Sequence, residues 1–253
     1  MKGWQYVIGF VLTVLVMSGC QASGREIPEE QLIDSTAKTL ERAYQKNRDL
    51  VGMQPSAAGI DFSALKNINP EIYAWLFIPG TSINAPITQS ESGDISFYQT
   101  HGPDLREDEH GSLYTHFRYS SRHFDELVSV IYGKTMSSVS VLDGIESLYR
   151  SVESMRQYQD VYVFTEEAVF RYCVFCSTEF SDVLISGAYR AFKAEDDTAE
   201  FLEDVRSYHT LRRQIDGSVS VDPGDRVLVL SKKLSRDEDQ RFLILAKLVD
   251  STN

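Results

Sequence analysis

The sequence predicts a mostly β fold, a closed or nearly closed barrel with helical inserts. Two observations favour it. Short runs of β-branched, aromatic and aliphatic residues follow one another through the chain, and glycine, proline, asparagine or aspartate separates many of them. The composition, 253 residues of which 42% are hydrophobic and 25% charged, suits one domain with a sizeable core. The expected strands cover residues 74–78, 83–88, 127–132, 161–164, 168–178, 226–230 and 242–249.

The first twenty residues have the layout of an export signal. Lys2 precedes an apolar run from Tyr6 to Met17, and two small residues then lead to Cys20. The ending resembles the lipobox of bacterial lipoproteins, in which this cysteine becomes the lipidated first residue. We therefore expect residues 1–19 to be a signal peptide and Cys20 to anchor the protein to the outer face of the cell membrane. A plain signal peptide or a short anchor is the alternative.

Helical periodicity marks three further segments. We expect residues 20–59 to be a tether and an N-terminal helix, because apolar residues recur there at three-to-four spacing before Gly52 and Pro55. The barrel domain covers residues 60–253 and contains helical inserts at about 142–158 and 196–213, the second of which precedes the last two strands. The apolar stripe of the second insert comprises Phe201, Leu202, Val205, Tyr208 and Leu211.

Charge and cysteine content limit the function. A net charge of −12 argues against a nucleic-acid partner, which requires a basic surface. After the N-terminus, no apolar stretch is long enough to span a membrane. Cys173 and Cys176 have the spacing of a redox pair, but they lie within a strand-like run, where residues three apart point to opposite faces. We therefore expect packing cysteines, and no cofactor.

Six segments together indicate a family. They are NPEIYAWLFIPGTSINAPITQS at 69–90, FYQTH at 97–101, GSLYTHFR at 111–118, VSVIYGKTM at 128–136, RVLVLSKKL at 226–234 and RFLILAKLV at 241–249. In this order they resemble the strands and motifs of class B sortases, including the Tyr-Gly-His-Asn and Thr-Leu-Ser-Thr-Cys elements. The resemblance covers roughly residues 69–249 and implies a sortase-like closed barrel of about eight strands, with a long helix inserted before the last two.

The departures from the family fall on its catalytic residues. In sortases a cysteine thiolate attacks a sorting-signal peptide, a histidine acts as acid or base, and an arginine stabilises the oxyanion. The equivalent positions here hold Lys233, Lys134 and Arg241. A lysine amine with an ordinary pKa is protonated at pH 7 and has no lone pair for attack. We expect these three residues to converge at one end of the barrel and attract anions, partly neutralised by Asp225 or a loop acid.

Other chemistries stay open. Ser231 with Lys134 or Lys233 would form a Ser/Lys acyl-transfer dyad, although serine is also normal in the family motif. A relocated catalytic histidine and a metal site at residues 101–110 are further alternatives, and we expect no metal. The candidate histidines are His101, His110, His116, His123 and His209.

The resemblance and the departures together predict a function. We expect a lipid-anchored pseudo-sortase that is catalytically inactive and binds a sorting-signal peptide, a surface or pilin-like protein, or an active sortase at the cell envelope. An active transpeptidase or hydrolase with a non-cysteine site is the rival hypothesis. A degenerate copy without a retained role is the third.

Overall fold

The computed structural model describes residues 59–133, 142, 144–234, 236–237 and 239–252. The signal peptide, Cys20, the expected N-terminal helix and Lys134 lie outside these residues. The strands of the described part are β1 Ile72–Phe77, β2 Asn84–Thr88, β3 Leu113–Tyr114, β4 Val128–Gly133, β5 Asp160–Thr165, β6 Val169–Ser181, β7 Gln214–Ile215, β8 Val227–Lys233 and β9 Gln240–Thr252. Its helices are α2 Phe62–Ile68, α3 Ile145–Leu148, α4 Val152–Gln157, α5 Ile185–Ala188 and α6 Glu195–Ser207, with short 3-10 turns η2 Phe97–Gln99 and η3 Arg190–Phe192.

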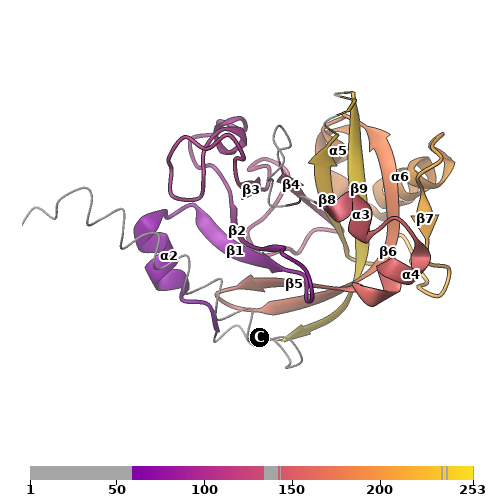
Figure 1. Cartoon of the computed structure of the whole chain (residues 1–253), viewed down its shortest axis with the longest axis horizontal. Coiled ribbons are helices and arrows are strands. Elements are labelled where there is room, and N and C mark those ends of the chain that lie inside the picture. Colours follow the sequence, from indigo (N-terminus) through magenta and orange to yellow (C-terminus); the bar gives the residue numbers. More distant parts are fainter. Residues whose placement is uncertain (1–58, 134–141, 143, 235, 238, 253) are drawn as a thin grey trace, which may run out of the picture.

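The predicted closed barrel is confirmed. The strand order is β5-β1-β2-β3-β4-β8-β9-β6-β7, and an additional pairing of β5 with β6 closes the ring and leaves β7 outside it. Figure 1 shows the long strands β6 and β9 crossing the barrel beside α6. The two-residue strands β3 and β7 are too short to show a periodicity; β3 lies in the GSLYTHFR segment that the resemblance singled out, whereas β7 was not predicted.

β8 lies in the middle of the sheet and is covered on both sides. It pairs in parallel with β4 and antiparallel with β9. Leu228 and Leu230 point into the barrel, whereas Val227 and Val229 pack with the outer cluster that includes residues of α6. Burial of both faces explains why this run is continuously apolar instead of alternating.

The inserted helix α6 is confirmed, but it ends earlier than predicted. Phe201, Leu202 and Val205 are buried against the barrel, whereas Leu211 lies beyond the helix and is 98% exposed. Tyr208 takes an extended conformation, and the guanidinium Nη1 of Arg213 donates to the Tyr208 carbonyl at 2.6 Å. The arginine thus satisfies a carbonyl at the helix end, and the periodicity that suggested a longer helix was misleading there.

The first insert differs from the single helix predicted for 142–158. It contains α3 and α4, and the Ser151 side chain caps α4 by accepting a hydrogen bond from the Ser154 amide. In the described part of the chain, no helix is both long and apolar enough to cross a membrane.

The two cysteines of β6 are unbonded packing residues. Cys176 is buried, and burial raises the pKa of its thiol to about 12. Cys173 is half-buried, and burial raises its pKa as well. Neither is a thiolate at neutral pH, so the pair lacks the reactivity of a redox motif.

Candidate functional site

The ends of β4, β8 and β9 meet at one side of the barrel. Lys233, the last residue of β8, is the cross-strand partner of Arg241 on β9. The Arg241 guanidinium carbon lies 5.3 Å from the centre of the Tyr132 ring on β4. Lys134, which follows β4, lies outside the described residues. Two of the three expected cations are therefore seen together, beside an aromatic residue that the sequence did not single out.

Asp182 binds both cations. Its Oδ2 lies 3.2 Å from the Lys233 Nζ, and its Oδ1 accepts a hydrogen bond from the Arg241 Nε at 2.5 Å. The residue directly follows β6, and its backbone amide donates to the carbonyl of Asp239 at 2.8 Å. This carboxylate leaves the group of three side chains with a net charge of +1 at neutral pH.

Asp182 is the loop acid that was expected to neutralise the site, whereas the alternative expectation, Asp225, was wrong. Asp225 precedes β8, at the opposite end of that strand from Lys233. Its Oδ2 pairs with the Lys247 Nζ at 2.7 Å. A strand of seven residues separates the two ends, so Asp225 does not contact Lys233 or Arg241.

Ser231 points to the same side of β8 as Lys233 but is fully buried. Its Oγ accepts a hydrogen bond from the Arg241 Nη1 at 3.2 Å. The Lys233 amine instead faces Asp182. The serine hydroxyl therefore lies beneath the guanidinium, and Lys233, one of the two lysines that could activate it, is held by a carboxylate.

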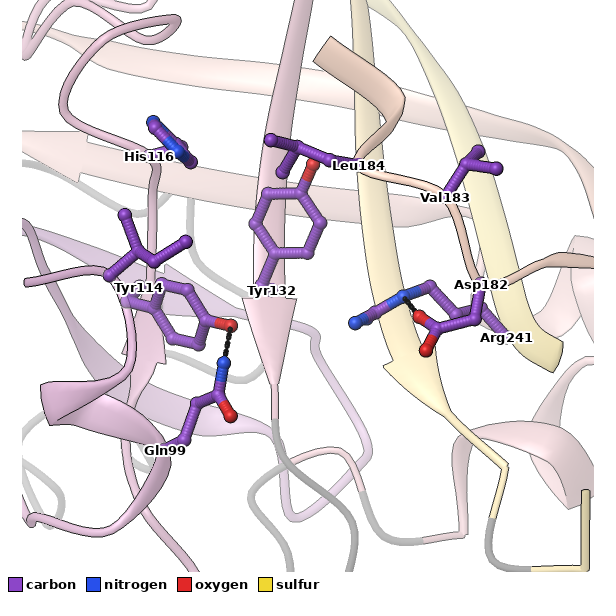
Figure 2. Close-up of a pocket in the computed structure, with 9 residues that line it drawn as sticks. Gln99, Tyr114, His116, Tyr132, Asp182, Val183, Leu184 and Arg241 are labelled. Carbon is purple, nitrogen blue, oxygen red and sulfur yellow. Dashed lines mark hydrogen bonds and ion pairs between the residues drawn. The ribbon is translucent and has the colours of Figure 1, made fainter. Parts of the chain in front are cut away.

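A pocket of about 210 Å³ opens beside Arg241 (Figure 2). Its rim is apolar and accessible, since Ile95, Val183 and Leu184 are 42%, 37% and 39% exposed. Its floor is polar. The described residues that line it are Ile95, Gln99, Tyr114, His116, Tyr132, Asp182, Val183, Leu184 and Arg241.

Burial controls the protonation of the floor. It raises the pKa of Tyr132 to about 12, despite the opposing effects of Ser186 and Arg241, and it raises the pKa of Tyr114. Burial also lowers the pKa of His116, with a further contribution from Arg118. At neutral pH the floor thus presents two neutral phenols and a neutral imidazole next to one guanidinium.

Tyr132 has an unusual hydroxyl group. It is buried and forms no hydrogen bond of standard geometry within the described residues, nor does the hydroxyl of Ser186, which lies close enough to lower the pKa of Tyr132. Figure 2 shows the Tyr132 hydroxyl pointing toward Leu184 at the rim. A buried polar group without a partner is costly and is often a sign of a group that a ligand or water completes.

Only one of the candidate histidines lines the pocket, His116. His101 stacks on Phe97, His110 contacts Asp108 at 2.6 Å, and His123 lies 3.4 Å from Glu167. His209 is exposed beyond α6. Within the described ranges, no three His, Cys, Asp or Glu side chains gather as metal ligands.

Sequence reasoning missed Asp182, Val183 and Leu184. A weak signal was present, because an acid followed by two apolar residues comes shortly after the strand expected at 168–178. The segment belongs to no periodic element, so nothing local indicated that it would lie across the ends of β8 and β9.

Comparison with known proteins gives one consistent fold. No protein-family model matches the chain. Sortase B of Staphylococcus aureus is 20% identical over 257 residues, covering 98% of both chains. Among solved structures, the Staphylococcus aureus sortase B–substrate complex has a TM-score of 0.65 at 19% identity and covers 87% of this chain and 99% of its own. A Streptococcus pyogenes class B sortase involved in pilus biogenesis has a TM-score of 0.62 at 19% identity, with coverage of 76% and 99%. The chain has the class B sortase fold.

Proposed function

We propose that this protein is a catalytically inactive relative of the class B sortases that binds an extended peptide in the pocket beside Arg241. The observation that carries the proposal is the ion-paired group at the end of β8. Lys233 stands where the resemblance places the nucleophile, and its amine is paired with Asp182 at 3.2 Å. A protonated amine held by a carboxylate has no lone pair for attack on a carbonyl.

The arrangement also weakens the oxyanion role of the arginine. The Nε of Arg241 donates to Asp182 and its Nη1 donates to Ser231, so two of its nitrogen atoms already have acceptors inside the protein. A buried Ser231 beneath this guanidinium supports binding over the rival Ser/Lys chemistry, in which the hydroxyl has to reach a substrate.

The rim supports a peptide ligand. Three exposed apolar side chains surround a small polar floor, which is the composition of sites that fix a ligand by a few polar contacts. One of the structurally similar proteins is a sortase B–substrate complex. A sorting-signal peptide, or a segment of a surface or pilin-like protein, is the partner we propose, with an active sortase as a further partner.

The location follows from the N-terminus. We propose that residues 1–19 are removed, that Cys20 carries the lipid, and that the barrel lies on the outer face of the cell membrane. The short apolar run ending in Ser18, Gly19 and Cys20 supports this location.

Two assays on the purified protein test the proposed function. Quenched fluorescent sorting-signal peptides should remain uncleaved. Heptapeptides selected from a random display library should bind the wild type and lose binding in Leu184→Asp, whereas Leu211→Asp, which places the same charge at an exposed site outside the pocket, should bind normally. Turnover in the first assay would contradict the inactive assignment. If the selected peptides bind Leu184→Asp as tightly as the wild type, the pocket is not the peptide-binding site.

A further inference from the structure

The floor of the pocket presents more hydrogen-bond donors than its own acceptors use. Arg241 directs its Nε to Asp182 and one Nη1 bond to Ser231, and its Nη2 has no partner among the described residues. The Tyr114 hydroxyl accepts from the Gln99 side chain at 3.2 Å, which leaves its own hydrogen available. The Tyr132 hydroxyl forms no hydrogen bond of standard geometry in the described structure, although Ser186 lies close to it.

From this excess of donors we infer that the pocket binds a carboxylate carried by the peptide, either a C-terminus or an acidic side chain. The inference rests on the proposed function and specifies the chemistry of its ligand. A carboxylate accepts several hydrogen bonds and donates none, so it matches a guanidinium flanked by two neutral phenols.

The protein already shows that a carboxylate fits these cations. Asp182 contacts Lys233 and Arg241 from one side and is the only acid among the described residues that line the pocket. Lys233 and Arg241 together outweigh Asp182 by one positive charge, and of these two cations Arg241 is the one that lines the pocket, within a chain whose overall net charge is −12. A local cation with partly buried surroundings keeps its attraction for an anion better than an exposed one, because solvent screens it less.

Size restricts what can enter. The pocket volume of about 210 Å³ lies below the roughly 300–1,000 Å³ of typical small-molecule sites. One side chain or one chain terminus fits this space, and the flanking residues of the peptide then contact Ile95, Val183 and Leu184 at the rim.

Four short peptides test the inference by calorimetry. N-acetyl-Leu-Ala-Leu is compared with its C-terminal amide, and N-acetyl-Leu-Ala-Glu-amide with the corresponding glutamine peptide. We expect one acid of these two pairs to bind about tenfold or more tightly than its neutral partner, as a charge-assisted hydrogen bond provides. The pair that shows the preference identifies the source of the carboxylate.

Variants of the pocket floor test whether it causes the preference for the acidic peptide. Arg241→Gln should abolish this preference, and Tyr132→Phe, which removes only the hydroxyl, should reduce it. Asp182→Asn should strengthen binding of the acid, because a competing anion is lost. Arg212→Gln is the charge-matched control, since Arg212 pairs with Glu179 and does not line the pocket. Thermal unfolding of each variant verifies that it is folded.

The outcomes separate this inference from the proposed function. Equal binding of the acidic and neutral peptides would contradict the inferred preference for a carboxylate, and the proposed binding of peptides would still stand. Binding of none of the four also overturns it, while the display selection with Leu184→Asp still decides whether the pocket holds a peptide. A preference that survives Arg241→Gln, or that Arg212→Gln removes equally, shows that the floor is not its source.

Discussion

Arg156 and Asp216 join α4 to the segment after β7 through two parallel hydrogen bonds. The Arg156 Nε lies 2.8 Å from Oδ2 and its Nη2 lies 2.8 Å from Oδ1 of the aspartate. Asp216 also accepts from the amide and hydroxyl of Ser218. Arg156, followed by Ser218, holds the pKa of the Asp216 carboxyl well below its usual range.

This pair predicts a pH-dependent contribution to stability. A carboxyl whose pKa is lowered by folding stabilises the protein above its unfolded pKa, about 3.9, and loses that effect as the pH falls below it. Asp216→Asn should therefore lower the free energy of unfolding at pH 7 relative to the wild type, and the difference should shrink between about pH 4 and pH 2. Urea unfolding across this range measures it. Glu203→Gln, an exposed carboxylate change on α6, is the control, and a pH-independent difference for Asp216→Asn would contradict the argument.

Restoring the family's catalytic residues should restore weak activity. Lys134→His with Lys233→Cys is expected to cleave sorting-signal peptides slowly, whereas either change alone stays inactive, because the two groups act as one unit. Asp182 would then lie beside the new thiol, where its charge raises the thiol pKa. Adding Asp182→Asn should increase cleavage on the order of tenfold, the effect of about one pKa unit on the thiolate fraction. Fluorescent peptide cleavage measures all variants. Wild-type cleavage that Ser231→Ala abolishes would support the Ser/Lys alternative instead.

The end of α6 predicts opposite results for two leucines of the same apolar stripe. Leu202→Ala removes a buried side chain and should cost about 2–5 kcal/mol of stability. Leu211→Ala should change stability by no more than about 0.5 kcal/mol, since the side chain is 98% exposed. Chemical denaturation of both variants measures the contrast. Similar losses for the two would show that α6 continues to Leu211 in solution.

Lipidation of Cys20 can be tested in cells. Metabolic labelling with a fatty-acid analogue should mark the wild type, which should fractionate with membranes, and should fail to mark Cys20→Ala. The cause is loss of the thiol that receives the lipid. Cys176→Ala, which removes a buried cysteine of the barrel, should be labelled like the wild type. Equal labelling of wild type and Cys20→Ala, or none in either, would refute the lipoprotein assignment.

The strands and their closure into a barrel could be predicted from the sequence, because they depend on the hydrophobic pattern and on the order of the segments. The runs now seen in β1, β2, β4, β5, β6, β8 and β9 are long or apolar enough to be recognised, and their closure follows from the resemblance. The neighbours Lys233 and Arg241 followed from the same strands. The pocket was not predictable, because Asp182, Val183 and Leu184 belong to a connecting segment whose position depends on contacts distant in the chain. The end of α6 was missed because the apolar periodicity continues to Leu211, beyond the last helical residue, Ser207.

The parallel pairing of β4 with β8 has a consequence for how the binding surface arises. Val128 on β4 is aligned with Val227 on β8, and roughly a hundred residues of chain lie between these two partners. Contacts between such distant segments are slow to form. Closing the intervening loop costs conformational entropy before the contacts can compensate for it. The pocket takes Tyr132 from β4 and Arg241 from β9, and therefore exists only in the completely folded chain. A ligand that binds it has no counterpart site in the unfolded chain, so raising the ligand concentration raises the melting temperature of the whole barrel.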